Sequence, residues 1–273
     1  MSDKAFLVDT SKCQGCRACQ VACKQWNGLP GEKTTFFEGT EYTNPANLSA
    51  ITWNHVKFFP LDRSNPSKPV WTIMHKKCYH CKEANCLAVC PEKAISKVDG
   101  WTIIDQSKCI GCGACENECV YAVPQVSQVR HTNDVGQNIV LKDKSHKCNA
   151  CTLNKREIPA CVNTCPSGAL LFGNRLELLK QAKSRVAELK KEFPRASLYG
   201  EKEFGGLRVL TILRDRPAKF GLPIGSEAQP IQGAKAESIK DIYSLLAMFT
   251  FGLPSLKKVA YNVSKSLASS RKA

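Results

Sequence analysis

The sequence predicts an α+β protein in which two small cysteine-rich modules are combined, one inserted in the other. Three observations lead to this expectation. The 273 residues contain sixteen cysteines, which fall into four groups of four. Short stretches with the composition of β-strands lie beside these groups. The order of the motifs along the chain indicates which groups belong together.

The four cysteine groups share a spacing. The first and third read CxxCxxCxxxC, and all four end in CxxxC. In chain order the groups are Cys13, Cys16, Cys19, Cys23; Cys78, Cys81, Cys86, Cys90; Cys109, Cys112, Cys115, Cys119; and Cys148, Cys151, Cys161, Cys165. Gly15, Gly111 and Gly113 lie within the first and third groups, where glycine permits backbone angles and close approaches that other residues resist.

Disulfides, structural zinc and iron–sulfur clusters are three explanations for so many neighbouring thiols. Disulfides persist in oxidising compartments, and we expect no secretory signal because the first apolar run, residues 5–8, is too short. A subunit exported as a folded complex with a partner would need no signal of its own. Zinc sites typically use two CxxC pairs around one ion, which an uninterrupted CxxCxxC run does not match.

The spacing is typical of bacterial ferredoxins. There, three cysteines of one run bind one cubane cluster and the fourth binds the neighbouring cluster. Because each of the four groups has this character, the sequence predicts two bacterial-ferredoxin-like modules and four 4Fe-4S clusters. All sixteen cysteines are then expected to be cluster ligands.

The residues between the groups indicate how the groups pair. In a two-cluster ferredoxin, the half that contains Cys-Pro continues through a short hairpin into the other half. Residues 90–112 follow this order, with Asp99-Gly100 as the hairpin turn between ISKV and WTII. Groups two and three therefore form one module. Group four has the leading half, CPSGALLF, and group one has the trailing half, FLVDTSKCQGC, so these two complete a second module around the first.

The crossed-ligand rule of ferredoxins then predicts four ligand sets. Set 1 is Cys13, Cys16, Cys19 and Cys165; set 2 is Cys148, Cys151, Cys161 and Cys23; set 3 is Cys78, Cys81, Cys86 and Cys119; set 4 is Cys109, Cys112, Cys115 and Cys90.

The expected division of the chain follows these modules. Module A comprises residues 1–23 and, after a connector, its second half within 125–173; residues 24–74 are an inserted aromatic β-rich lobe; 75–124 are module B; 174–230 are a helix and an extended partner-binding segment; 231–273 are an amphipathic C-terminal tail.

Residues outside the cysteine groups have mainly structural interpretations. ITWNHVKFF and VWTIM predict strands of the inserted lobe. Residues 174–193 predict a packing helix that Asn174 caps. Its expected apolar stripe is Leu176, Leu179, Val186, Leu189 and Phe193. His75 and His80 flank group two, and we interpret them as supporting or surface residues and not as ligands, because four cysteines are already present.

The net charge of +15 raises the question of nucleic-acid binding. The lysines are scattered and no aromatic-plus-basic RNA motif is present, so we expect no nucleic-acid partner. Four clusters with thiolate ligands carry about −2 each, which offsets about eight of the positive charges. The sequence shows no nucleotide-binding glycine loop and no acid–base constellation. We therefore expect the chain to carry electrons while a partner performs catalysis.

These motifs resemble the four-cluster electron-transfer (beta) subunits of molybdenum or tungsten bis-pterin oxidoreductases, and among them most closely those of formate dehydrogenases. The resemblance covers residues 4–225, and its most specific parts are CQVACKQWN, the block from KCNAC to PACVNTCPSGAL, AKSRVAELK, and LYGEKEFGGLRVLTILRDRPAKFGLP. Relatives of the nitrate reductase branch replace one cluster cysteine by tryptophan. This sequence keeps all sixteen, which argues against that branch.

The resemblance implies a molybdenum or tungsten bis-pterin catalytic partner, with formate as its substrate, and a membrane or soluble electron-acceptor subunit. The alternatives are a subunit of a polysulfide or dimethyl sulfoxide type reductase, a hydrogenase-linked subunit, or a free polyferredoxin. It also implies a membrane-associated complex, located either in the cytoplasm or outside it by co-export with a signal-bearing catalytic subunit.

The tail is expected to dock and not to span a membrane. Its longest uncharged stretch, residues 242–256, is shorter than the roughly 20 residues that a span requires, and Gly252 and Pro254 interrupt it. We expect two short amphipathic segments there, which contact a partner subunit or a membrane surface. The alternative is that they fold back on the protein's own core.

Overall fold

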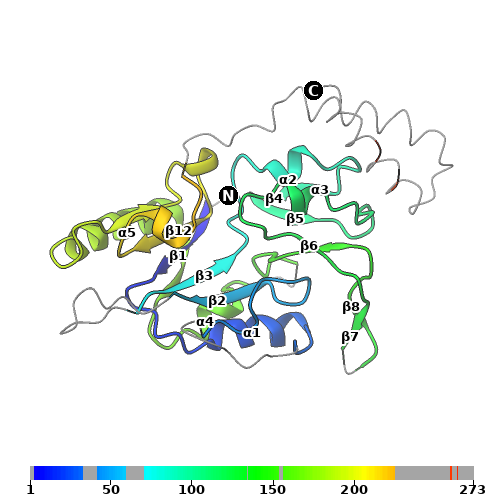
Figure 1. Cartoon of the computed structure of the whole chain (residues 1–273), viewed down its shortest axis with the longest axis horizontal. Helices are drawn as coiled ribbons and strands as arrows, with labels where there is room; N and C mark the ends of the chain where they lie inside the picture. The colour runs from blue at the N-terminus through cyan, green and yellow to red at the C-terminus, as the bar shows by residue number, and fades with distance from the viewer. Residues whose placement is uncertain are drawn as a thin grey trace.

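The computed structural model describes residues 3–32, 42–59, 71–133, 135–153 and 156–224, together with Val259 and Val263. In these residues short helices and short strands alternate, as expected for an α+β protein (Figure 1). The predicted tail, residues 231–273, lies outside the described residues except for the two valines. Part of the predicted inserted lobe lies outside them as well.

A four-stranded sheet joins distant parts of the chain. Its strand order is β10 (Leu170–Asn174), β1 (Lys4–Asp9), β12 (Val209–Leu213) and β11 (Ser197–Tyr199). Strand β1 pairs antiparallel with β10 and parallel with β12. Because β1 leads into the first cysteine group and β10 follows the fourth, this pairing brings those two groups to the same edge of the fold.

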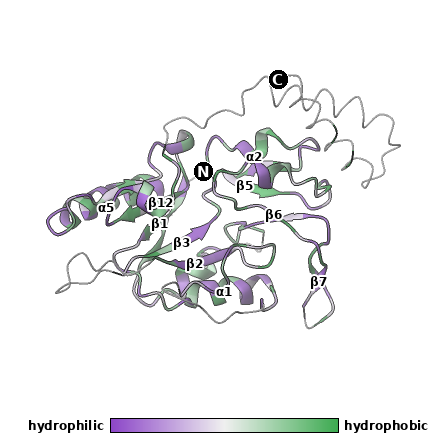
Figure 2. Cartoon of the chain, viewed as in Figure 1, coloured by the Kyte–Doolittle hydropathy of each residue, from purple (hydrophilic) through white to green (hydrophobic). Residues whose placement is uncertain are grey.

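Helix α5 (Arg175–Leu189) covers one face of this sheet (Figure 1). It carries both hydrophilic and hydrophobic residues, as Figure 2 shows. Its buried residues are Leu178, Ala182, Val186 and Leu189, which pack on Ala5, Leu7, Leu210 and Ile212 of the sheet. The Asn174 side chain caps the helix by accepting hydrogen bonds from the backbone N–H groups of Leu176 (2.9 Å) and Glu177 (3.3 Å), which confirms the predicted cap.

The predicted extent and stripe of this helix need correction. The helix ends at Leu189, before the predicted end at residue 193, and a turn follows. Leu176 was expected in the apolar stripe but is 71% exposed, because in the first turn it points away from the sheet. Leu178 takes the corresponding buried place. Phe193 still packs against the same apolar cluster from beyond the helix end.

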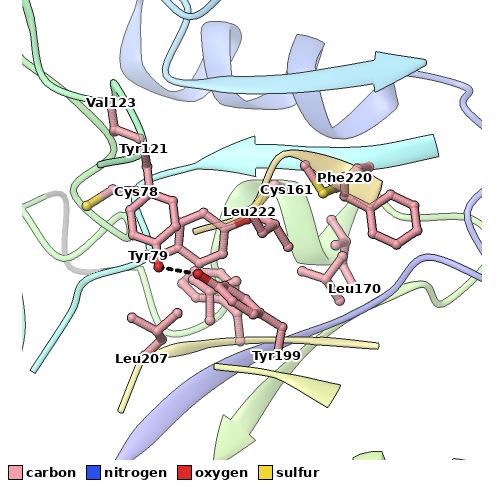
Figure 3. Close-up of a cluster of buried hydrophobic side chains, with 14 of the residues drawn as sticks. Cys78, Tyr79, Tyr121, Val123, Cys161, Leu170, Tyr199, Leu207, Phe220 and Leu222 are labelled. Carbon is pink, nitrogen blue, oxygen red and sulfur yellow. Dashed lines mark hydrogen bonds between the residues drawn. The ribbon is translucent and has the colours of Figure 1, made fainter. Parts of the chain in front are cut away.

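The other face of the sheet adjoins the central core of the molecule. Phe6 and Val8 alternate with Ala5 and Leu7 along β1 and contribute to this core. Three buried tyrosines lie within it: Tyr79 stacks on Tyr121 with ring centroids 4.2 Å apart, and the hydroxyls of Tyr121 and Tyr199 are 2.7 Å apart (Figure 3).

Two antiparallel strand pairs match the sequence patterns to different degrees. Strands β2 (Asn54–Phe58) and β3 (Ile73–Lys77) pair antiparallel. Strands β4 (Ile95–Val98) and β5 (Trp101–Ile104) pair with Val98 opposite Trp101. The predicted two-residue turn between them has positive φ at both Asp99 (48°) and Gly100 (80°), as a type I′ turn requires. ISKV and WTII are confirmed as strands, and β2 lies within ITWNHVKFF, but β3 shares only Ile73 and Met74 with VWTIM and continues to Lys77.

The remaining elements are short. They are α1 (Ala18–Asn27), α2 (Asn85–Ala88), α3 (Ala114–Asn117), α4 (Ala160–Asn163), β6 (Gln125–Val126), β7 (His131–Thr132), β8 (Asn138–Val140), β9 (Ser145–His146) and the 3-10 turns η1 (Glu203–Gly205) and η2 (Pro217–Phe220). None of the helices in the described ranges combines the length and the apolar content that crossing a membrane requires.

Candidate metal centres

The four cysteine groups adopt the same local structure. In each group the third cysteine is the second residue of a helix: Cys19 in α1, Cys86 in α2, Cys115 in α3 and Cys161 in α4. The last cysteine of each group then follows four residues later. Helix α1 packs against α4, and α2 packs against α3. The structure therefore arranges the groups as two pairs, one and four, and two and three.

Glycine is required where the loop of group three meets a neighbouring segment. Gly111 has φ +62°, and a Cβ atom placed on it would lie 1.9 Å from the backbone oxygen of Asp143. Gly113, two residues further on, has φ +79°, but its Cβ position meets only the end of the Asn117 side chain at 4.0 Å. Gly111 is thus required because the Asp143 backbone lies against it, whereas Gly113 is required only for its backbone conformation.

Cysteines of set 1 lie together although they come from the two ends of the cysteine-rich region. Burial raises the pKa of Cys13, and the neighbouring sulfurs of Cys165 and Cys16 raise it further against a backbone hydrogen bond from Gly15. Burial likewise raises the pKa of Cys19 to about 12, with contributions from Cys161, Cys13, Cys16 and Cys165. Cys165 is thus a neighbour of the first group as well as of its own.

Cysteines of sets 2 and 4 each line a small cavity. One cavity is lined by Cys23, Cys148, Cys151 and Cys161, together with Lys77 and Asn27. The other is lined by Cys90, Cys109, Cys112 and Cys115, with Gly111, Gly113 and Ser145. In both cases the fourth sulfur comes from a different cysteine group than the other three.

Cysteines of set 3 are neighbours in the same sense. The pKa of Cys81 is raised by burial and then by Cys78, Cys86 and Cys119. The pKa of Cys119 is raised by burial and by Cys78. Members of each of the four sets therefore lie near one another.

The thiols fit an iron–sulfur cluster better than a single metal ion. Within the described residues, no three His, Cys, Asp or Glu side chains converge closely enough to share one ion. Four sulfurs around a single zinc would meet that condition, since each Zn–S bond is only about 2.3 Å long. The sulfurs of sets 2 and 4 ring a cavity without converging to that degree. Buried thiols such as Cys115, whose pKa is raised by burial to about 12, also need bound metal to be thiolates near neutral pH.

Neighbouring sulfurs also give the order of the sets in space. Cys161 of set 2 contributes to the raised pKa of Cys19 in set 1. Cys78 of set 3 contributes to that of Cys148 in set 2, and Cys86 of set 3 contributes to that of Cys115 in set 4, in each case after burial. The sets therefore follow one another in the order 1, 2, 3, 4. Cys16 of set 1 is exposed, so the series reaches the protein surface at that end.

Several sulfurs accept hydrogen bonds that only the fold reveals. Backbone N–H groups donate to Cys90 (from Ala94, 3.2 Å), Cys109 (from Ser145, 3.4 Å) and Cys148 (from Ala150, 3.4 Å). The Ser145 hydroxyl lies 3.2 Å from the Cys115 sulfur. Ser145 stands 30 residues from Cys115, and no motif announces it.

Two histidines near group two turn out to be buried. His75 is 6% exposed, and its Nε2 atom lies 2.9 Å from the Cys19 sulfur of set 1. His80 is fully buried, and its Nδ1 atom accepts a hydrogen bond from the backbone N–H of Thr102 at 3.2 Å. Their interpretation as surface residues is wrong. For His75 the alternative interpretation, support of a site, agrees with its contact.

Comparison with protein-family models identifies the type of centre. Two models, each described as a 4Fe-4S dicluster domain, match residues 12–94 and residues 69–175. Together the two matches include all sixteen cysteines. Two dicluster domains give four 4Fe-4S clusters, so the predicted cofactors are confirmed.

Curated proteins with similar sequences extend this result. The formate dehydrogenase, nitrate-inducible, iron-sulfur subunit of Escherichia coli K12 is 34% identical over 230 residues, covering 81% of this chain and 73% of that protein. The formate dehydrogenase iron-sulfur subunit of Haemophilus influenzae is 32% identical over 265 residues, covering 94% and 79%. The hydrogenase-2 operon protein HybA of E. coli O157:H7 is 31% identical over 269 residues, covering 83% and 76%.

Proposed function

Because this chain belongs to the family of formate dehydrogenase iron–sulfur subunits, we propose that it conducts single electrons between a formate-oxidising catalytic subunit and an acceptor subunit. It is an electron-transfer subunit with four 4Fe-4S clusters. A bound 4Fe-4S cluster supplies reversible one-electron chemistry. The proposed catalytic subunit contains a molybdenum or tungsten bis-pterin, and the proposed acceptor is a membrane or soluble protein.

The single observation that carries this function is the ordered series of cysteine sets. Cys19 and Cys161 connect set 1 with set 2, and Cys86 and Cys115 connect set 3 with set 4. The third cysteine of groups one, three and four is buried, whereas that of group two, Cys86, is partly exposed. A series of neighbouring sets that reaches the surface at Cys16 suits electron transfer to a partner that docks there.

We further propose sets 1 to 4 as the ligand sets. The two cavities lined by four sulfurs each support sets 2 and 4. The proximity of Cys165 to Cys13 supports set 1, and that of Cys119 to Cys78 supports set 3.

The proposed arrangement has module B, residues 75–124, inserted in module A. The antiparallel pairing of β1 with β10 supports this arrangement, because it closes module A around the insertion. The continuous hairpin of β4 and β5 between groups two and three supports module B as one unit. Residues 24–74 are then an insertion within module A, and 174–230 form a partner-binding segment.

The proposed location is a membrane-associated complex, in the cytoplasm or exported with the catalytic subunit. For the tail, residues 231–273, we keep the proposal from the sequence that its apolar side chains dock on a partner or a membrane surface. Deleting residues 239–273 should leave all four clusters in place and weaken this attachment. Loss of the clusters on truncation would instead make the tail part of the core.

The proposed function is tested on the chain purified without oxygen together with its natural partner. We expect about sixteen irons and sixteen sulfides per chain, following from four clusters. We also expect formate to reduce the clusters, as seen by loss of brown absorbance and by electron paramagnetic resonance. Close to eight irons would overturn the cluster assignment, and failure of formate to reduce fully loaded complex would overturn the proposed substrate.

One other function has a specific observation in its favour. The similarity to the hydrogenase-2 operon protein HybA supports a hydrogenase as the alternative partner. In the same experiment, reduction of the clusters by hydrogen gas but not by formate would select this alternative.

A further inference from the structure

A lysine precedes the first cysteine of every group: Lys12, Lys77, Lys108 and Lys147. The four lysines differ in their exposure to solvent. Lys12 is exposed, and the Lys108 side chain is 62% exposed. Lys77 and Lys147 are only 2% and 5% exposed. Lysine is almost never fully buried without a partner, so the two buried lysines need an explanation that the repeated sequence position does not give.

Lys77 reaches from the strand before set 3 to the sulfurs of set 2. Its Nζ atom lies 4.0 Å from the Cys161 sulfur and 3.2 Å from the centre of the Phe6 ring. It also lines the cavity that Cys23, Cys148, Cys151 and Cys161 surround.

Lys147 makes the reciprocal crossing from the loop before set 2 to set 3. Its Nζ atom donates to the carbonyl oxygens of Thr102 in β5 and of Cys148, the latter at 3.2 Å. Its side chain also hydrogen-bonds to Cys78 of set 3, and Cys86 of the same set lies near it. Lys77 therefore lies near the cysteine group that follows Lys147 in the sequence, and Lys147 lies near the group that follows Lys77.

Neither buried lysine has a carboxylate partner. Among the described residues, no Asp or Glu oxygen lies within ion-pair distance of the Lys77 or the Lys147 ammonium group. A buried ammonium without a counter-charge costs several kcal/mol. A thiolate-ligated cluster beside each lysine would supply the negative charge that balances its ammonium group.

We propose that Lys77 and Lys147 are the resident counter-charges of the two inner clusters, Lys77 at set 2 and Lys147 at set 3, and that they raise the reduction potentials there. This inference deepens the proposed function and rests on its ligand sets. Reduction adds one negative charge to a cluster, so a fixed positive charge beside it favours the reduced state. The two lysines are positioning residues, and they set how easily an electron crosses from one half of the series to the other.

The test replaces each lysine by methionine in the full chain loaded with its clusters. Lys77→Met and Lys147→Met are compared with Lys12→Met and Lys108→Met, which remove a lysine from the same sequence position at the exposed sites. Redox titrations followed by electron paramagnetic resonance give the potential of each cluster. We expect Lys77→Met and Lys147→Met each to lower the reduction potential of one cluster by at least about 59 mV. For one electron, this shift is a tenfold change in the reduction equilibrium constant. The two exposed variants should leave all potentials within a third of that shift.

Equal shifts in buried and exposed variants, or unchanged potentials in the buried ones, would overturn the proposal. Where a methionine variant loses clusters, Lys77→Arg and Lys147→Arg decide. If the positive charge is what matters, the arginine variants should regain the iron content. If the shape of the lysine side chain matters, the arginine variants should lose iron as the methionine variants do. The exposed Lys97, which also lies near set 3, is kept unchanged throughout.

The counter-charge inference and the proposed function can fail separately in these experiments. Iron content and reduction by formate are measured on the wild-type chain, and they test that function alone. Wild-type protein with sixteen irons and formate-reducible clusters, together with silent lysine variants, would refute only the counter-charge inference.

Discussion

The Nε2 atom of His75 lies 2.9 Å from the Sγ atom of Cys19, although 56 residues separate the two in the sequence. His75 belongs to β3, and Cys19 lies at the start of α1. The Asn54 side chain in β2 also donates to the backbone oxygen of Cys19 at 2.9 Å. Strand β2 belongs to the lobe expected to be only structural, and β3 crosses from that lobe into module B. This strand pair thus holds a hydrogen-bonding ring at a sulfur of set 1.

Replacing His75 by leucine should lower the potential of the cluster at set 1. A donor to a ligand sulfur stabilises the more negative reduced state, and loss of about 1 kcal/mol of this preference corresponds to a shift on the order of 40 mV. A redox titration of the variant measures the shift. His131→Leu, at a partly exposed histidine in β7, is the control and should leave the potentials unchanged. A shift of similar size in the control would refute the role of His75.

The crossed pairing predicts different losses for two cysteines of the same group. Cys165→Ser should damage the cluster held by Cys13, Cys16 and Cys19, because Cys165 neighbours the first of these. Cys161→Ser should damage the cluster of set 2 instead. Each variant should retain about three quarters of the wild-type iron if the weakened cluster is lost. Electron paramagnetic resonance identifies which cluster disappears, and loss of the same cluster in both variants would contradict the pairing.

The β4–β5 hairpin and the cluster number could be predicted from the sequence because they depend on local spacing. Asp99-Gly100 fixes the β4–β5 turn by its own backbone preference, and Asn174 caps α5 through its own side chain. The burial of Leu176 was predicted wrongly, since the period of a helix does not tell which side of its first turn faces the sheet.

The supporting contacts of the metal centres could not be predicted in the same way. His75 and Ser145 reach sulfurs that lie far from them in the sequence, and no spacing rule connects the members of either pair. Lys77 and Lys12 occupy the same place before a cysteine group, yet only Lys77 is buried. Which of the two becomes buried depends on how the cysteine-rich halves pack together.

Gly111 and Gly113 offer a test of the close approach in group three. Gly111→Ala should lose the cluster of set 4, because the new Cβ atom would lie 1.9 Å from the backbone oxygen of Asp143. Both substitutions carry the cost of a positive φ, about 1 kcal/mol or more, but Gly113→Ala meets no backbone. Iron analysis should find about a quarter less iron in Gly111→Ala and near-normal iron in Gly113→Ala. Equal losses in both would mean that backbone conformation alone matters.

The buried tyrosines lead to a prediction about stability. The Tyr199 hydroxyl lies 2.7 Å from that of Tyr121 and donates to the backbone oxygen of Pro223 at 3.0 Å. Tyr199→Phe removes both hydrogen bonds and leaves the buried Tyr121 hydroxyl without a partner, which should cost about 1–3 kcal/mol. Tyr121→Phe removes one bond and keeps the bond to Pro223, so it should cost about 1 kcal/mol.

Tyr79 is the matched control for both tyrosine variants. Its ring stacks on Tyr121, but its buried hydroxyl has no hydrogen-bond partner among the described residues. Tyr79→Phe should therefore be neutral or slightly stabilising, because it removes a polar group that is buried without compensation. Thermal unfolding of the loaded chain, followed by loss of the cluster absorbance, should rank the apparent Tm values as Tyr79→Phe highest, then Tyr121→Phe, then Tyr199→Phe. A Tyr121→Phe variant as unstable as Tyr199→Phe would show that the bond to Pro223 contributes nothing.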